Sequence, residues 1–109
     1  MAQTHKVLGQ VNPSATTATT LYTVPASTST IASTLSIANL SASGVTYRVA
    51  VRPTGETLAN KHYLAYDTSL PANDSAVLTM GITLGTTDVV TVYGSTANLA
   101  FSLFGVEIT

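Results

Sequence analysis

The residue types that could carry catalysis in this chain are His62, Asp67 and a serine, either Ser69 or Ser75. A serine nucleophile needs an imidazole base that a carboxylate orients, and these are the residue types of a hydrolytic triad. Their spacing is not specific, and the sequence has no Gly-x-Ser-x-Gly motif. With 11 serines in the chain, a serine near a histidine is expected by chance. We therefore interpret His62 as an edge or turn residue bound by a neighbour, and we expect no enzymatic activity.

The sequence does not predict a metal or cofactor site. The chain has no cysteine, which excludes thiolate zinc sites and cysteine nucleophiles together. Its two histidines, His5 and His62, are far apart, whereas a metal site needs clustered ligands. Asp74 and Asp88 stand beside predicted turns, where a short carboxylate caps backbone amides. The acidic residues are spread along the chain at Glu56, Asp67, Asp74, Asp88 and Glu107.

Arg48, Arg52 and Tyr66 are the candidate subunit-interface residues. The two arginines are half of the four basic residues and share one face of the clearest predicted strand, ~13 Å apart. At that separation each could fork onto a separate carboxylate of a neighbouring subunit. The alternative is that both are solvated edge charges that discourage aggregation. Tyr66 is the one aromatic residue that we expect as a surface contact, in a chain without tryptophan.

Two N-glycosylation patterns, Asn39-Leu40-Ser41 and Asn73-Asp74-Ser75, carry no weight as motifs. Five asparagines among 31 serines and threonines produce such matches by chance.

The elements that must position these side chains are predicted to be β-strands, because apolar residues recur with period two. The clearest strands are residues 45–52 and 76–84, and the others are 6–11, 20–24, 31–38, 62–66, 88–93 and 99–108. In 31–38 we expect Ile31, Leu35 and Ile37 to share one face. The side chains expected to be largely buried are Tyr47, Val49, Val51, Leu78, Met80, Ile82, Phe101 and Leu103.

About eight short strands separated by turn signals predict an all-β fold, a single-domain antiparallel β-sandwich of the jelly-roll or immunoglobulin-like type. We expect residues 15–109 to form the sandwich and residues 1–14 to be an N-terminal arm or a first edge strand. The longest connection, residues 53–61, fits either a helical turn around 56–60 or a Greek-key crossover.

Length and charge limit the classes of function. A chain of 109 residues makes one domain, and a net charge of −1 leaves no basic patch for nucleic acid. No apolar run approaches the ~20 residues that span a bilayer, and no secretory signal precedes the first strand. Only 8% of the residues are charged, although charge is what usually keeps exposed strand edges from pairing. We therefore expect a homo-oligomer or a lattice component.

Four blocks carry a resemblance to a known group of proteins: Leu21-Tyr-Thr-Val-Pro, Tyr47-Arg-Val-Ala-Val-Arg-Pro, Leu58-Ala-Asn-Lys-His-Tyr-Leu-Ala-Tyr-Asp, and residues 88–108. From about Thr20 onward the chain resembles small virion structural proteins of tailed bacteriophages that infect cyanobacteria and marine bacteria. The resemblance implies a non-enzymatic particle component that is made in the host cytoplasm and used in the virion. It transfers no functional residues.

Within that class the resemblance favours a capsid decoration, or cement, protein. Such a protein, commonly a trimer, binds the outside of the shell and clamps neighbouring major capsid subunits. Tail, baseplate or fibre is the alternative location. A host-surface adhesion module remains a further alternative, in which loops 54–60 and 71–75 bind glycans.

Overall fold

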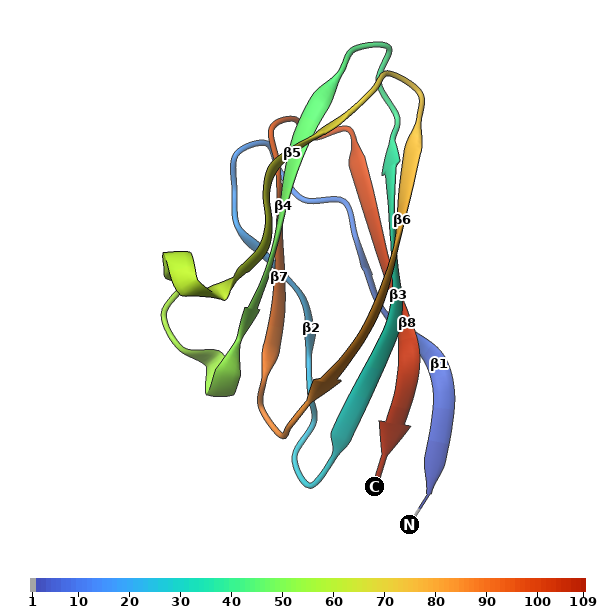
Figure 1. Cartoon of the computed structure of the whole chain (residues 1–109), viewed down its shortest axis with the longest axis vertical. Helices are drawn as coiled ribbons and strands as arrows, with labels where there is room; N and C mark the ends of the chain where they lie inside the picture. Colours follow the sequence, from blue (N-terminus) through green and yellow to red (C-terminus); the bar gives the residue numbers. More distant parts are fainter. Residues whose placement is uncertain (1) are drawn as a thin grey trace.

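Eight antiparallel strands form two four-stranded sheets that pack face to face in the computed structural model, which describes residues 2–109 (Figure 1). This confirms the predicted all-β sandwich. Sheet A contains, in spatial order, β1 (Gln3–Val11), β8 (Leu99–Ile108), β3 (Ser29–Asn39) and β6 (Ser75–Leu84). Sheet B contains, in spatial order, β2 (Thr19–Thr23), β7 (Val89–Gly94), β4 (Val45–Arg52) and β5 (Tyr63–Leu70).

The strand order is that of a jelly roll. The chain changes sheet at every connection except the one between β4 and β5, and the sheets contain the pairs β1–β8, β2–β7, β3–β6 and β4–β5. This is the path of one long hairpin wrapped into two sheets, which gives the two Greek keys of the jelly roll. An immunoglobulin-like sandwich pairs its first two strands in one sheet, whereas β1 and β2 lie in different sheets here.

The start of β1 and the end of β8 lie at the same end of sheet A (Figure 1). Ala2 and Thr109 exchange two backbone hydrogen bonds of 3.0 and 2.9 Å, which extend the pairing of β1 with β8. The segment expected as an arm or first edge strand therefore contributes β1 to the edge of the sandwich. Its first residue, Met1, lies outside the described residues.

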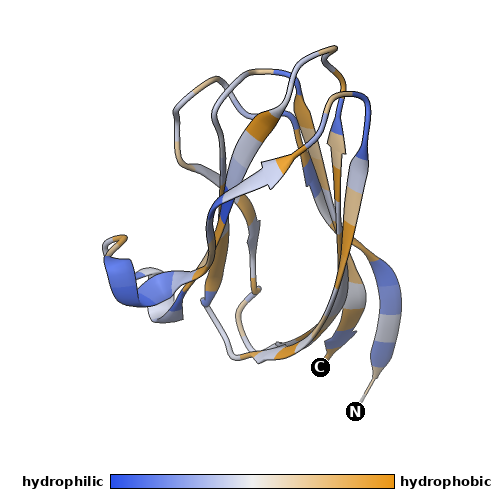
Figure 2. Cartoon of the chain, turned by 45° about the horizontal axis from the view of Figure 1, so that its top comes forward, coloured by the Kyte–Doolittle hydropathy of each residue, from blue (hydrophilic) through white to orange (hydrophobic). Residues whose placement is uncertain are grey.

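The core lies between the sheets and contains residues of all eight strands, and hydrophobic and hydrophilic residues alternate along much of the ribbons (Figure 2). Phe101 and Leu103 on β8 and Tyr47 and Val49 on β4 are buried as predicted, each at most 3% exposed. The other fully buried large apolar side chains are Leu35, Ile37, Leu84, Leu99, Val24, Val90 and Val92.

Four of the side chains expected to be largely buried are only partly buried, namely Val51, Leu78, Met80 and Ile82. The last three face the core from β6, and the reason is the position of that strand. β6 is an edge of sheet A, so its inward side chains have a neighbouring strand on one side only. The alternation was predicted correctly, but the depth of burial was not.

The prediction that Ile31 shares a face with Leu35 and Ile37 is wrong. Ile31 is 38% exposed, whereas Ala32, Leu35 and Ile37 are all fully buried. A β-bulge between Ala32 and Thr34 shifts the register of β3 against both of its neighbours and inverts the alternation. Gly105 of β8 lies beside this bulge, where a Cβ atom would collide with the carbonyl oxygen of Ile31.

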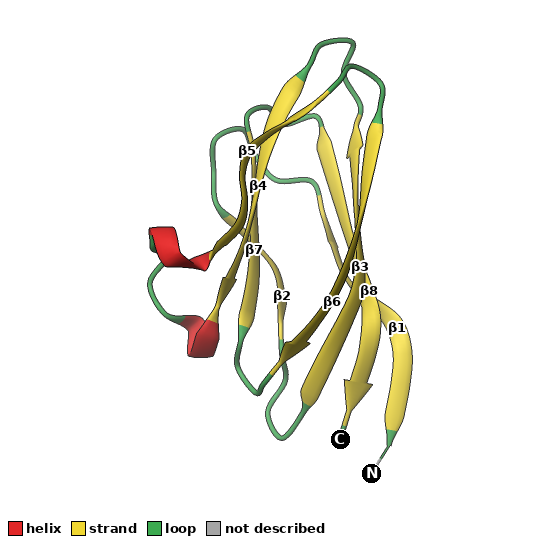
Figure 3. Ribbon diagram, viewed as in Figure 1, coloured by secondary structure: helices red, strands yellow, loops and turns green. Residues whose placement is uncertain are grey.

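The connection between β4 and β5 does not contain a helical turn around 56–60. Two short 3-10 turns instead occupy its ends, η1 (Pro53–Gly55) and η2 (Asn60–His62), and both project from one side of sheet B (Figure 3). Because β4 and β5 are neighbours in sheet B, the connection is not a crossover between sheets either.

One hydrogen-bonded network ties the sheets together. The Tyr22 hydroxyl on β2 donates to Glu107 Oε2 on β8 over 2.6 Å and lies 2.8 Å from the hydroxyl of Thr30 on β3. Lys6 of β1 contacts the other carboxylate oxygen of Glu107 at 3.3 Å. The Tyr22 hydrogen bond holds the pKa of Glu107 below its ordinary value, so the carboxylate stays ionised although it is 14% exposed.

We predict that Phe101→Ala lowers the free energy of unfolding by about 3–5 kcal/mol, because it leaves a cavity between the sheets. Phe104→Ala is the matched control, since Phe104 lies three residues further along β8 and is only partly buried. Chemical denaturation of both variants measures the difference. Equal costs at the two positions would contradict the assignment of the β8 faces.

Ionisation of Tyr22 gives a prediction for alkaline pH. Burial, and then the bond to Glu107, raise the pKa of Tyr22 to about 12, against ~10 in an unfolded chain. The folded state therefore holds this proton more tightly, and the resulting stability is complete below pH ~10 and is lost as the pH rises towards 12. We expect the free energy of unfolding to fall by about 2 kcal/mol over that window. Tyr22→Phe, measured in the same urea titrations, should show a shallower fall, and an unchanged slope would contradict the prediction.

Candidate interaction surface

Arg48 is the centre of a cluster on the outer face of sheet B. Its guanidinium lies between two tyrosine rings, with its carbon 4.1 Å from the ring centroid of Tyr66 on β5 and 4.1 Å from that of Tyr93 on β7. It also forks onto Asp67, with Nε 2.6 Å and Nη2 3.3 Å from the two carboxylate oxygens. Cation–π contacts and bidentate pairing are the interactions that a planar guanidinium favours. The side chain is therefore held from both neighbouring strands.

A β-bulge in β5 explains how Tyr66 and Asp67 both reach Arg48. The register pairs Tyr47 with Thr68 and Val49 with Ala65, so two residues of β5 lie opposite Arg48 alone. Asp67 has a φ of 50°, in the left-handed region that aspartate enters more readily than most residues. In an unbroken strand consecutive side chains would point to opposite faces. The bulge instead presents an aromatic ring and a carboxylate on one face.

A second bulge adds Tyr63 to the cluster. Ala50 pairs with Tyr63 and Val49 with Ala65, which leaves Leu64 without an opposite residue. Without this bulge Tyr63 and Tyr66, three residues apart, would point to opposite faces. Their rings instead meet edge to face, with centroids 4.8 Å apart and planes at 81°. With Asn60 of η2 they line a hollow of about 300 Å³.

Arg52 is bound within the chain as well. Its Nε donates to the Thr91 hydroxyl over 3.0 Å, and its Nη1 donates to the backbone carbonyl of Glu56 over 3.0 Å. These contacts attach the 53–62 connection to β7. Both candidate arginines therefore have partners in their own chain, and Tyr66 is the candidate with the largest free surface, at 55% exposed. Ala50, which lies between the two arginines on β4, is buried and pairs with Tyr63 and Thr91 of the neighbouring strands.

The catalytic candidates are not brought together. His62 is buried, and its Nδ1 accepts the Ala59 amide at 3.0 Å, so the neutral ring carries its proton on Nε2 and donates to Glu56 over 3.1 Å. This contact, and a second from Lys61, hold the pKa of Glu56 below its ordinary value. Asp67 is bound to Arg48 and not to the histidine. His62 therefore has a structural role: its two hydrogen bonds, to Ala59 and Glu56, hold the 53–62 connection in place.

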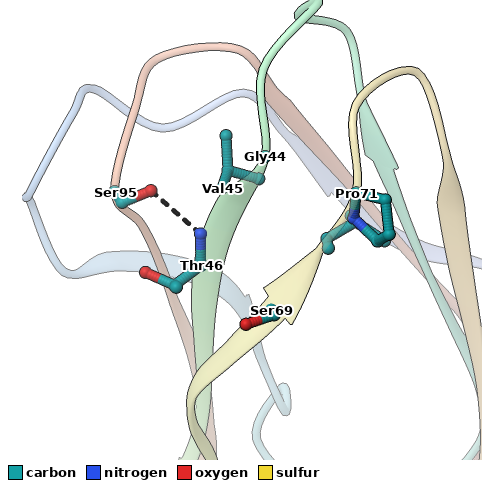
Figure 4. Close-up of a pocket in the computed structure, with 7 residues that line it drawn as sticks. Gly44, Val45, Thr46, Ser69, Pro71 and Ser95 are labelled. Atoms are coloured by element: carbon teal, nitrogen blue, oxygen red, sulfur yellow. Dashed lines mark hydrogen bonds between the residues drawn. The ribbon is translucent and has the colours of Figure 1, made fainter.

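A second hollow, of about 460 Å³, lies at the end of the sandwich where β4 begins and β5 ends (Figure 4). Ser95 accepts the Thr46 amide there over 3.0 Å. The remaining lining consists of Gly44, Val45, Ser69, Leu70 and Pro71. It contains no titratable group, so this hollow offers neither acid–base chemistry nor charge to a ligand.

Other sequence motifs have structural roles. Asn39 is 4% exposed, and its amide nitrogen donates to the carbonyls of Ser43 and Pro71 at 2.9 Å each, so it is closed to glycosylation. Within residues 2–109, no three His, Cys, Asp or Glu side chains gather into a metal-binding group. Over the same range, no helix has the length and apolar character that crossing a membrane would need.

The outer face of sheet A differs from that of sheet B. Ile31, which is 38% exposed, lines a shallow hollow of about 340 Å³ there together with Phe104 and Val106, and its rim includes His5, Lys6 and Ser33. Val7 of β1, opposite Phe104, is 47% exposed. Val77 of β6 is 64% exposed. Sheet A thus presents apolar and hydroxyl side chains to the outside, and sheet B presents the arginine–tyrosine cluster.

Arg48 and Tyr66 were predicted as candidates from the sequence, whereas Tyr63, Tyr93 and the pairing of Arg48 with Asp67 were not. Tyr93 follows from the pattern, because it lies on an outward position of a neighbouring strand. Tyr63 and Asp67 depend on bulges, for which the sequence offers no clear signal.

Comparison with models of known protein families gives no match to this sequence, and comparison with curated proteins finds none that is significantly similar.

We predict that Arg48 and Tyr66 are energetically coupled by about 0.5–1 kcal/mol. The measurement is a double-mutant cycle of Arg48→Ala and Tyr66→Ala, read as free energies of unfolding. Leu64→Ala is the matched control, because Leu64 lies on the same strand and is equally exposed but has no ring to cover the guanidinium. A coupling with Leu64 as large as that with Tyr66 would contradict a specific cation–π contact.

Proposed function

We propose that this protein is a non-enzymatic structural component of a tailed-phage virion, most specifically a capsid decoration protein that binds the outside of the shell as a homo-oligomer, with a trimer favoured. Its partner is the major capsid protein. The resemblance of four sequence blocks to such virion proteins supports the proposal, and so does the jelly-roll order, an architecture that viral capsid domains use.

The observation that carries the proposal is the edge strand β6. Its ten residues include no charged side chain, and its inward residues Leu78, Met80 and Ile82 remain partly exposed. Uncharged, apolar edges pair with other chains unless they are covered. The other three edge strands are shorter or carry a charge, since β2 has only five residues, β1 carries Lys6 and the twice-bulged β5 carries Asp67. β6 has one bulge, at Met80 and Gly81, but ten residues without a charge. An assembly that covers β6 accounts for this difference.

Decoration acts by mass action. A protein that binds only the assembled shell stabilises that shell over its separated subunits, and many equivalent copies each contribute. On this proposal β6 and the apolar outer face of sheet A face neighbouring subunits. The arginine–tyrosine cluster of sheet B, on the other face of the sandwich, stays free.

The copy number of the chain per purified phage particle tests this proposal, by quantitative mass spectrometry against the major capsid protein. We expect hundreds of copies, because only the icosahedral lattice offers so many equivalent sites. A few to some tens of copies would place the chain in the tail, baseplate or fibre and overturn decoration. Absence from the particle would overturn the virion function.

A charge variant tests the edge in the same particles. Val77→Lys places a charge on the exposed face of β6, and Leu64→Lys places the same charge at a similarly exposed position of β5. We expect Val77→Lys to lower the copy number and Leu64→Lys to leave it unchanged. The opposite result would exclude β6 as the assembly edge.

A further inference from the structure

The hollow between Asn60, Tyr63 and Tyr66 has the chemistry of a sugar-binding site. At about 300 Å³ it is at the lower end of the range of small-molecule sites. Tyr66 is 55% exposed, which is unusual for a large aromatic residue in a small sandwich. The carbon-bound hydrogens of a pyranose ring pack on an aromatic face, while amides and phenol hydroxyls bind its hydroxyl groups.

The rings of Tyr63 and Tyr66 meet nearly at right angles, and we call this arrangement the corner. Arg48 covers one face of Tyr66 at 4.1 Å, and Asp67 fixes that guanidinium with a 2.6 Å bond. In the perpendicular pair of Tyr63 and Tyr66, one ring touches the other only by its edge and keeps a face free of its partner. A tyrosine has few rotatable bonds, so a ring that is already held costs little entropy when it binds a ligand.

Asn60 supplies the polar part of the hollow. It is exposed, and it belongs to η2, which the hydrogen bond between His62 and Glu56 holds in place. Its backbone carbonyl accepts the Tyr63 amide, and the residue lines the hollow. One amide group offers both donors and an acceptor, which matches the paired hydroxyls of a sugar.

Charge distinguishes the class of sugar. The positive charge of Arg48 is matched by the carboxylate of Asp67, and none of the three residues that line the hollow is charged. A carboxylated or sulfated sugar would therefore lose hydration without gaining a free counter-charge. We propose that this corner binds a neutral pyranose unit of a glycan, with Tyr63 and Tyr66 as stacking residues and Asn60 as hydrogen-bonding residue.

This site goes beyond the decoration function and does not depend on it. It lies on sheet B, away from β6 and the apolar face of sheet A, so shell binding and sugar binding use different surfaces. It also differs from the glycan-binding loops expected from the sequence, because Tyr63 and Tyr66 are on β5, and only Asn60 belongs to the 54–60 loop.

Saturation-transfer NMR with the purified chain tests the site. The probes are lactose, maltotriose and N,N′-diacetylchitobiose as neutral sugars, and 3′-sialyllactose as the acidic one. We expect transfer to at least one neutral sugar, with binding about tenfold weaker for Tyr66→Ala and for Asn60→Ala. Leu64→Ala, at an equally exposed position of the same strand, should bind as the unmodified chain does.

Three outcomes would overturn the proposal. The first is that none of the neutral sugars binds. The second is binding that Tyr66→Ala and Asn60→Ala both leave unchanged, which would place the ligand elsewhere. The third is that a proline-rich peptide, the other ligand that docks on exposed aromatic rings, binds this corner in place of every sugar. Thermal unfolding of each variant separates lost binding from lost folding, and Tyr66→Phe, which keeps the ring, should bind nearly as well as the unmodified chain.

Discussion

The alternation of side chains across a pleated strand is the constraint on which the structure depends. Each strand supplies one face to a shared core, and the buried residues of the two sheets meet there. With 8% charged residues and no cysteine, the chain has few ion pairs and no disulfide that could hold the fold in another way. Burial and backbone pairing therefore provide its stability. Where a strand departs from strict alternation of inward and outward residues, different side chains reach the surface.

Those departures occur as bulges, and they account for the features that distinguish this sandwich from a plain one. The bulge in β3 turns Ile31 outward and adds it to the apolar face of sheet A. The two bulges in β5 turn Tyr63, Tyr66 and Asp67 to one side of sheet B. A one-residue insertion in a strand thus changes which chemistry the molecule presents, while the core keeps its composition.

The fold class could be predicted from the sequence, because a strand with one buried face shows alternating apolar and polar residues. The sequence was also sufficient for the centre of the candidate site, since Arg48 is a charge on the outer face of the clearest strand. Depth of burial was not predictable, because Leu78 and Phe101 have similar local patterns but lie on an edge and a central strand. The partner of Arg48 was not predictable either, since it depends on the left-handed backbone of Asp67, a single residue.

The scarcity of charge explains why the two outer faces differ. The charged side chains that the chain has are almost all bound: Arg48 to Asp67, Lys6 to Glu107, and Lys61 to Glu56. Each such pair fixes a local structure, and none lies on β6. Glu107 links strands of both sheets, and the pair of Arg48 and Asp67 orders the outer face of sheet B. The uncharged strands β3 and β7 lie inside their sheets, and of the two uncharged edge strands β2 has five residues and β6 has ten. β6 is therefore the edge that the proposed assembly would cover. The two proposals, assembly along β6 and sugar binding on the outer face of sheet B, both rest on where these few charged side chains lie.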